Sequence, residues 1–307
     1  FGDEQTKAIT DYHDMLKDPS VDIVSVCVPN YLHAPISIDC LNAGKHVLCE
    51  KPASVNYQLV LDMKAAADRN NRILNIGVVN RFNTAVNKVR DLINAGELGE
   101  VYHIYCSFRA HRSIPGLGGQ FTTKAMAGGG VLIDWGVHFI DLICYCINTP
   151  AVKSVTGAAY SKLANKMTDY VYTDMWAGPP KYDGTYDVEE FITGMVRTAG
   201  PSITLNGAWA QNIDEGAMFI EFMGDKAGIK LQYGGNFTLY STKNGMLTQT
   251  AYNMKMADMF YDEIDAFIHC AMAGEKIRSN VDQILVTAQI MDALYQSAAT
   301  NKEVSFT

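Results

Sequence analysis

Three short apolar runs, separated by helical segments, constrain the fold of this chain more than any other feature of its sequence. The runs are 23–28, 46–49 and 73–79, and a polar residue or a proline follows each of them. Such continuous apolar runs are typical of strands that are buried on both faces, as in a parallel sheet. Because strands and helices alternate, the sequence predicts an α/β fold with a doubly wound parallel sheet.

Helices are predicted between these strands, over 34–43 and 55–69. Pro35 would lie in the first turn of the first helix, where a proline is tolerated, and Ser54 would cap the second helix. The order of these elements places a first domain at residues 1–80.

Side chains suited to ligand binding follow all three predicted strands. Asn30, Lys51 and Arg81 each stand just beyond the carboxyl end of a strand, which is where ligands bind in sheets of this kind. Three such residues at three successive strand ends favour a binding site. The alternative is that they only cap loops and face solvent.

The chain changes character after Arg81. Short strand candidates with turn signals between them predict an α+β second domain, residues 81–307, with a large open and mainly antiparallel sheet. The stretch 165–186 is rich in Tyr, Asp, Gly and Pro, so we expect a long functional loop there. The strand candidates are 101–108, 152–159, 188–198, 202–210, 217–223, 228–233 and 237–241.

Composition excludes several classes of protein. The chain has 307 residues, of which 48% are apolar and 19% charged, so it is globular and long enough for two domains. A net charge of −8 without Lys or Arg clusters argues against a nucleic acid partner. No apolar run approaches the ~20 residues of a membrane helix, so no membrane partner is expected. The seven cysteines form no C-x-x-C pair, which indicates reduced thiols in the cytoplasm and no metal site.

A polar stripe interrupts an otherwise apolar helix that follows three glycines, 128–130. Asp134, His138 and Asp141 stand at positions i, i+4 and i+7, so on an α-helix they share one face. One interpretation is a structural carboxylate–histidine pair. The other is a catalytic pair in which Asp134 orients His138, whose ordinary pKa of about 6.5 lets it accept a proton near neutral pH.

Five motifs together resemble the glucose–fructose oxidoreductase and inositol dehydrogenase family, Gfo/Idh/MocA. The resemblance spans most of the chain and keeps the family's order. The Glu-Lys-Pro motif and the Asp-x-x-x-His pair are specific in combination, and they favour the catalytic interpretation of Asp134 and His138. The motifs are Val-Pro-Asn-Tyr-Leu-His at 28–33, Ala-Gly-Lys-His-Val-Leu-Cys-Glu-Lys-Pro at 43–52, Asn-Arg-Phe at 80–82, Gly-Glu-Leu-Gly-Glu-Val at 96–101, and Gly-Gly-Gly-x-x-x-Asp-x-x-x-His at 128–138.

The resemblance implies a Rossmann domain that binds NAD or NADP, followed by a domain whose open sheet often serves oligomerisation. A homodimer or homotetramer is therefore expected. The catalytic group implied by the motifs is Lys51, Asp134 and His138. The implied cofactor-binding residues are Pro29, Asn30, His33, Glu50, Lys51 and Arg81.

The implied activity is hydride transfer between the nicotinamide and a secondary alcohol of a sugar, polyol or glycoside. Neutral His138 would be the base, cationic Lys51 would stabilise the developing alkoxide, and Asp134 would hold the imidazole. Two alternatives stay open. One is a non-catalytic sugar or dinucleotide sensor on the same fold, against which the intact group of three residues argues. The other is an enzyme that cleaves glycosides with tightly held NAD, which cofactor retained after purification would favour.

One departure from the family concerns its Gly-x-Gly-x-x-Gly turn, which cradles the pyrophosphate and does not occur in this sequence. We expect the family's first β-α-β unit to precede Phe1. Without it, the strand predicted at 23–28 would leave a long apolar edge open. The choice between NAD and NADP stays open, because the residue that decides it ends the family's second strand.

Overall fold

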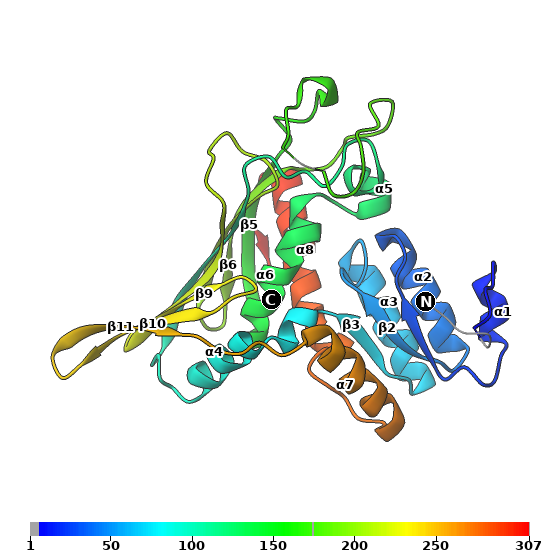
Figure 1. Cartoon of the computed structure of the whole chain (residues 1–307), viewed down its shortest axis with the longest axis horizontal. Helices are drawn as coiled ribbons and strands as arrows, with labels where there is room; N and C mark the ends of the chain where they lie inside the picture. The colour runs from blue at the N-terminus through cyan, green and yellow to red at the C-terminus, as the bar shows by residue number, and fades with distance from the viewer. Residues whose placement is uncertain (1–5, 174, 307) are drawn as a thin grey trace.

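The chain folds around two separate β-sheets with helices between them, as a computed structural model describing residues 6–173 and 175–306 shows (Figure 1). A cleft lined by residues of both parts lies where the strands of the smaller sheet end. One sheet has three parallel strands and the other has nine strands, most of them antiparallel. The predicted fold class is therefore confirmed.

The parallel sheet has the strand order β1-β2-β3, and two helices pack together against one of its faces. The side chains of Leu74 and Ile76 are fully buried between the sheet and its cover. The elements are β1 (Ile23–Val26), α2 (Asn30–Asn42), β2 (His46–Glu50), α3 (Tyr57–Asn70) and β3 (Leu74–Gly77).

Burial on both faces was predicted for all three strands, and it holds for β3 but not for β1. Every residue of β3 is buried, whereas Ile23 is 38% exposed and Ser25 is exposed as well. The physical reason is the place of β1 in the sheet. Among the described strands it pairs with β2 alone, so its other edge is open.

Both predicted helix starts are shifted. α2 begins at Asn30 and not at residue 34, so Pro29 occupies the N-cap position and Pro35 lies inside the helix. α3 is capped by Asn56 in place of Ser54, through a side-chain oxygen that accepts a backbone hydrogen bond. The earlier start of α2 places Asn30 in its first turn, next to the carboxyl end of β1.

The larger sheet has the order β11-β10-β9-β8-β4-β7-β6-β5-β12, and only the β4–β7 pair is parallel. All seven predicted strands are present. The hairpin strand β11 was not predicted because most of its side chains are exposed, so it lacks the apolar pattern of a buried strand, although Asn244-Gly245 is a typical two-residue hairpin turn. The strands are β4 (Val101–Arg109), β5 (Val152–Tyr160), β6 (Phe191–Thr198), β7 (Ser202–Ala208), β8 (Ala217–Gly224), β9 (Ala227–Gln232), β10 (Phe237–Lys243), β11 (Met246–Tyr252) and β12 (Val304–Ser305).

One face of the nine-stranded sheet is covered by α6 (Val137–Cys146) and α8 (Val281–Thr300), with α4 (Thr84–Asn94) beside them (Figure 1). α8 contributes side chains to two cores. Val281 and Ile284 pack with the parallel sheet, whereas Met291 and Leu294 pack with the larger sheet. This shared helix fixes the position of one sheet relative to the other.

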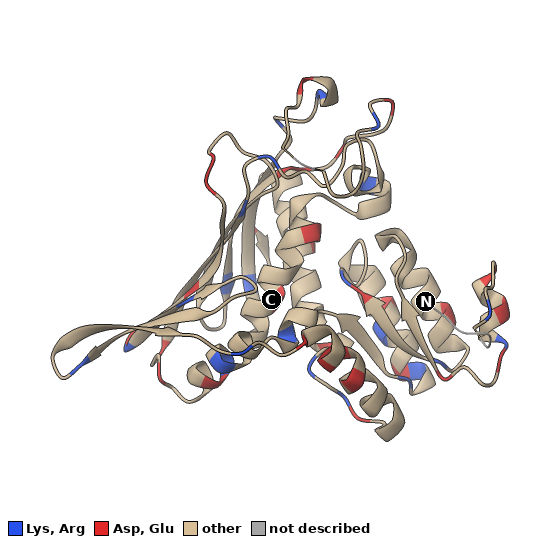
Figure 2. Ribbon diagram, viewed as in Figure 1, with Lys and Arg blue, Asp and Glu red and all other residues tan. Residues whose placement is uncertain are grey.

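The remaining helices are short or lie at the edges of the two sheets. α7 packs Phe267 and Cys270 against Leu48 and Ile73 of the parallel-sheet region. Lys and Arg are interspersed with Asp and Glu along the chain (Figure 2). These helices are α1 (Tyr12–Leu16), α5 (Lys124–Ala127), α7 (Met259–Ala273), the 3-10 turns η1 (Val79–Phe82), η2 (Gln120–Thr122) and η4 (Met167–Asp169), and the π-helical turn η3 (Leu132–Gly136).

The helical stretch Lys124–Cys146 is the one place in residues 6–173 and 175–306 that is long and apolar enough to cross a membrane. However, 78% of its most apolar 18-residue segment is buried inside the fold. Its apolar character is thus used for packing within the protein.

Candidate active site

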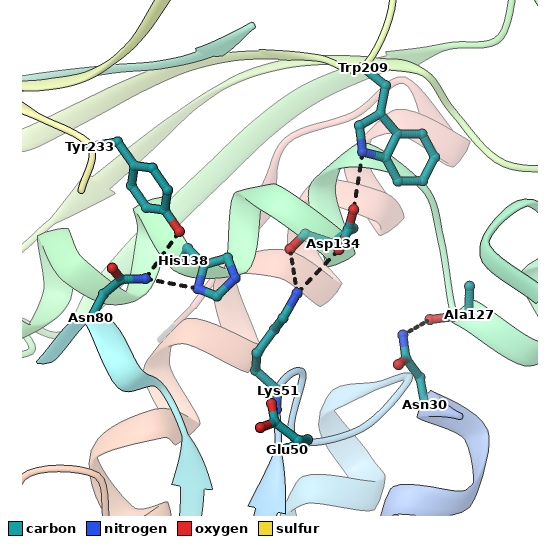
Figure 3. Close-up of polar contacts among 9 residues, drawn as sticks. All are labelled: Asn30, Glu50, Lys51, Asn80, Ala127, Asp134, His138, Trp209 and Tyr233. Atoms are coloured by element: carbon teal, nitrogen blue, oxygen red, sulfur yellow. Dashed lines mark hydrogen bonds and ion pairs between the residues drawn. The ribbon is translucent and has the colours of Figure 1, made fainter. Parts of the chain in front are cut away.

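Lys51 extends from the end of β2 across the cleft to Asp134 (Figure 3). Its ammonium group donates to the backbone oxygen of Asp134 at 3.1 Å and to Oδ1 of the same residue at 3.2 Å. The Lys51 side chain is 24% exposed and that of Asp134 is 10% exposed. The pair is therefore shielded from bulk water but still reaches the cleft.

Asp134 lies in η3, a π-helical turn, and this turn changes the predicted geometry. Its second carboxylate oxygen, Oδ2, accepts a hydrogen bond from Nε1 of the fully buried Trp209 at 3.2 Å. A π turn holds more residues than an α turn, so positions four apart no longer stack. The predicted Asp134–His138 pair is therefore wrong, and Asp134 holds the Lys51 ammonium group instead.

Two residues outside its own helix surround the His138 ring (Figure 3). Nδ1 of His138 lies 3.3 Å from the Asn80 amide nitrogen, which also donates to the Tyr233 hydroxyl at 3.1 Å. Burial, together with the positive charge of Lys51, lowers the pKa of His138 to about 3. The ring is thus neutral at pH 7, and its pKa lies well below the ordinary value assumed from the sequence.

The three predicted catalytic residues converge on one pocket of about 370 Å³. Lys51, Asp134 and His138 line it together with Trp176 and Tyr233. Lys51 comes from the parallel sheet, whereas Asp134 and His138 come from the helices that cover the larger sheet. We name this space the catalytic pocket.

A second pocket, of about 280 Å³, adjoins the catalytic pocket at the carboxyl ends of β1 and β2, and we name it the strand-end pocket. Asn30, Glu50 and Lys51 line it, and Asn30 donates to the Ala127 carbonyl oxygen at 2.9 Å. Pro29 lines the neighbouring space. The exposed Glu50 carboxylate and the Lys51 ammonium group fit the hydroxyl groups of a ribose, so these residues suit the nicotinamide end of a dinucleotide.

His33 reaches this strand-end pocket with no free ring nitrogen. Its Nδ1 lies 2.6 Å from the Pro52 carbonyl oxygen and its Nε2 lies 2.8 Å from that of Val28, and the residue is buried. His33 thus connects the loops that follow β1 and β2. Its ring therefore lies at the wall of this pocket with both nitrogens in contact with backbone oxygens.

Arg81 is not placed to bind a cofactor, and that prediction is wrong. Its fully buried guanidinium group donates to both carboxylate oxygens of Asp141 at 2.8 Å. The remaining N–H groups donate to Arg278 O and to two oxygens of Gln283. All five donors are therefore used within the protein. Asp141, predicted to share a face with His138, serves this buried pair instead.

Glu189 fixes the backbone from which η3 starts. Its buried carboxylate accepts hydrogen bonds from the backbone of Gly130 at 2.9 Å and of Leu132 at 3.1 Å, and from the Tyr295 hydroxyl at 2.9 Å. A Cβ atom at Gly129 would lie 1.9 Å from that hydroxyl oxygen, so glycine is required there. These contacts hold the turn that carries Asp134.

Sequence reasoning assigned no role to several side chains that shape the site. Asn80 was part of a quoted motif and Trp209 stood inside the predicted strand 202–210, but neither sequence position shows which side chain it touches. Tyr233 and Trp176 lie near the end of a strand and in the long loop. Of these three aromatic residues, Trp176 alone stood outside the predicted strands and helices, and that was the available signal.

Comparison with known proteins gives matches over both parts of the chain. The family model described as "Oxidoreductase family, NAD-binding Rossmann fold" matches residues 3–78, and the GFO/IDH/MocA C-terminal domain model matches residues 86–230. The D-glucoside 3-dehydrogenase of Escherichia coli K12 is 31% identical over 294 residues, which are 94% of this chain and 81% of that protein.

Two further similarities extend this result. The myo-inositol 2-dehydrogenase of Thermotoga maritima is 30% identical over 139 residues, 45% of this chain and 40% of that protein. A levoglucosan dehydrogenase solved with NADH and levoglucosan has a TM-score of 0.83 at 20% identity and shares the fold over 97% of this chain and 83% of its own. The chain thus belongs to the Gfo/Idh/MocA family of NAD-binding oxidoreductases.

Proposed function

We propose that this oxidoreductase oxidises a secondary hydroxyl group of a sugar, polyol or glycoside, with NAD or NADP as the hydride acceptor. The observation that carries the proposal is the contact of Lys51 with Asp134 in the pocket that His138 also lines. Relatives named for a glucoside and for inositol support this substrate class.

Lys51 is the residue that binds and polarises the reacting oxygen. Its ammonium group has three N–H donors, two of which Asp134 accepts. Asp134 itself is held by Trp209, so the cation is fixed before a substrate arrives. A fixed positive charge stabilises the negative charge that develops on an alcohol oxygen as it loses its proton.

His138 is the proton acceptor in this proposal, and Asn80 controls which nitrogen can accept. If the Asn80 amide nitrogen donates to Nδ1, the ring proton lies on Nε2, and Nε2 can only donate. Rotating the amide presents its oxygen to an Nδ1–H group and frees Nε2 to accept a proton. The Tyr233 hydroxyl can accept from or donate to Asn80, so it satisfies both orientations.

The direct test combines a substrate screen with two variants. NAD and NADP are each assayed against a panel of sugars, polyols and glycosides. With the best pair, His138→Ala should lower kcat by about 10²–10⁴-fold, the usual contribution of a general base, while cofactor affinity stays nearly constant. Lys51→Ala should lower both turnover and cofactor affinity, because Lys51 lines both pockets. Near-normal turnover of His138→Ala would remove His138 from the mechanism.

The uncovered face of the nine-stranded sheet supports a homodimer or homotetramer. Tyr105 and Phe219 contact each other edge to face on neighbouring strands, 5.7 Å between ring centroids, and both are only partly buried. Joining two such faces would bury these rings. A monomer in sedimentation at micromolar concentration would contradict this. The seven free cysteines, six of them buried, support the proposed cytoplasmic location.

A further inference from the structure

A third cavity, of about 380 Å³, lies beyond Phe121, between the loop around 116–123 and the loop around 177–181. We name it the loop pocket. Leu117, Phe121, Met126 and Pro179 give it apolar walls, and Gln120 and Thr123 add polar groups. None of the residues proposed for hydride or proton transfer lines it.

Two aromatic rings connect the loop pocket to the catalytic pocket. Phe121 lines the loop pocket and the strand-end pocket, and Trp176 lines the strand-end pocket and the catalytic pocket. The two rings meet edge to face with their centroids 4.9 Å apart. Trp176 is 65% exposed, so its ring is accessible to a ligand. A ligand too long for the catalytic pocket would therefore pass along these rings.

The two loops hold the loop pocket open by backbone contacts. Ala177 donates to the Pro115 carbonyl oxygen at 2.8 Å, and Lys181 donates to that of Leu117 at 2.9 Å. At Gly118, a Cβ atom would lie 1.8 Å from the Lys181 oxygen, so the loops approach as closely as glycine permits. Such a cavity is formed before a ligand binds, which is typical of small-molecule sites.

We propose that the loop pocket binds a ring attached to the sugar that is oxidised, so that glycosides with a ring substituent are preferred over small ones. The proposal rests on the sugar oxidation proposed above. The apolar walls suit the flat face of an aryl group or the C–H face of a second sugar, and the polar groups suit hydroxyls. Phe121 and Trp176 would then determine specificity by packing against the bridging part of the substrate.

Gly119 offers a way to fill the loop pocket without disturbing its walls. No atom lies within 4 Å of a Cβ built there, and its φ of −102° is open to any L-residue. Because Gly119 lines the loop pocket, we expect the indole ring of Gly119→Trp to occupy part of it. The matched control is Gly200→Trp at an exposed glycine in the turn between β6 and β7, where the nearest atom to a Cβ is 3.8 Å away.

The experiment compares kcat/KM for phenyl glucoside, cellobiose and methyl glucoside. The native protein should prefer at least one of the two ring-bearing glycosides to methyl glucoside by about 10-fold or more, the usual value of a well-filled apolar subsite. Gly119→Trp should abolish most of this ratio, and Gly200→Trp should keep it. A ratio carried by phenyl glucoside assigns the pocket to aryl groups, and one carried by cellobiose assigns it to a second sugar.

Two results would overturn the proposal. One is equal kcat/KM for all three substrates in the native protein. The other is a Gly119→Trp protein that keeps the substrate ratio and has a raised KM for NAD or NADP, because the pocket would then serve the cofactor. If none of the sugars is oxidised, the proposed function fails separately, and calorimetry with phenyl glucoside decides the pocket. Phenyl glucoside binding that is lost in Gly119→Trp supports the proposed pocket. Equal binding to the native protein and Gly119→Trp, or no binding to either, contradicts it.

Discussion

Two cation–carboxylate pairs connect the parallel-sheet region to the larger sheet. They differ in whether the cation keeps a hydrogen-bond donor that no protein atom accepts. Lys51 and Asp134 are partly exposed at a pocket. Arg81 and Asp141 are buried, with side-chain exposures of 0% and 2%. Both cations follow strands of the same sheet, so residue type and position made them look equivalent. Access to a pocket and a spare hydrogen-bond donor separate the pair proposed to act in catalysis from the structural one.

The difference follows from the chemistry of the two cations. The planar Arg81 guanidinium group has five donors in a fixed arrangement, and oxygens of three residues accept all of them. The Lys51 ammonium group is compact and sits on a flexible chain, so it can turn toward a new oxygen. A buried pair whose donors are all used within the protein holds two parts of a fold together. A pair whose cation keeps a free donor can also bind a ligand.

The largest expected effect is on stability, in Arg81→Met. The substitution leaves Asp141 buried without its cation, which should lower the free energy of unfolding by about 3–5 kcal/mol. Urea unfolding measures the change. Arg197→Met is the matched control, because Arg197 pairs with Glu303 on the surface and should cost at most about 1 kcal/mol. Equal losses of unfolding free energy in the two variants would mean that the buried pair stabilises the fold no more than the surface pair does.

Lys51→Met should reverse the pattern, with a large loss of activity and a small loss of stability. Removing the fixed positive charge should lower kcat by about 10²–10³-fold. Asp134 keeps its hydrogen bond from Trp209, so the free energy of unfolding should fall by less than it does in Arg81→Met. Kinetic assays and urea unfolding on the same preparations measure the loss of activity and the loss of stability. A stability loss as large as that of Arg81→Met would show that Lys51 is mainly structural.

A third buried carboxylate sharpens the comparison because it has no cation. Glu263 on α7 is 4% exposed, and its Oε1 has no hydrogen-bond partner among the described residues. Burial and the negative charge of Glu50 raise the pKa of Glu263 from about 4.5 to about 8. The folded protein therefore holds a proton that the unfolded chain releases between these values. Stability contributed by this group is lost as the pH rises through that range.

Glu263→Gln should remove this pH dependence. Between pH 5 and pH 8 the native protein should lose about 3–4 kcal/mol more unfolding free energy than the variant, because glutamine keeps a similar shape without titrating. Urea unfolding at the two pH values gives the difference. Glu97→Gln, at an exposed carboxylate, is the control. Parallel losses in Glu263→Gln and the native protein would mean that Glu263 is already ionised at pH 5.

The smallest effect is a shift in the titration of His138. The positive charge of Lys51 is one of the two causes that lower the pKa of His138 to about 3. Lys51→Gln should therefore raise this pKa by about one unit, and the burial of the ring should keep it below the ordinary value. NMR titration of the ring measures it, with Lys226→Gln at an exposed lysine as the control. An unchanged pKa would mean that Lys51 exerts little field on the ring.

The features that the sequence predicted are those set by residues close together in the chain. The parallel strands followed from local apolar runs, and Lys51 was found because it stands at a strand end. The partners of Arg81 are 60 and more residues away, at Asp141, Arg278 and Gln283, and no local pattern shows them. Its assignment to the cofactor failed for this reason.

The π-helical turn is the second feature that local pattern could not give. Positions 134 and 138 fit an α-helix, but Glu189 and Tyr295, far along the chain, fix the backbone before the turn. The predicted pairing of Asp134 with His138 depended on regular α-helical spacing. Because the turn is not α-helical, Asp134 contacts Lys51, and Asn80 contacts His138.

The sharing of α8 between the two cores has a consequence for biosynthesis. Val281 and Ile284 complete the core under the parallel sheet, and Met291 and Leu294 complete the core under the larger sheet. α8 follows every strand of both sheets except β12 in the chain. A ribosome delivers it after nearly all other elements, so neither sheet has its full apolar cover while the preceding 280 residues emerge. Both cores need the same helix to be complete. We therefore expect the two cores to reach their final packing together, late in synthesis.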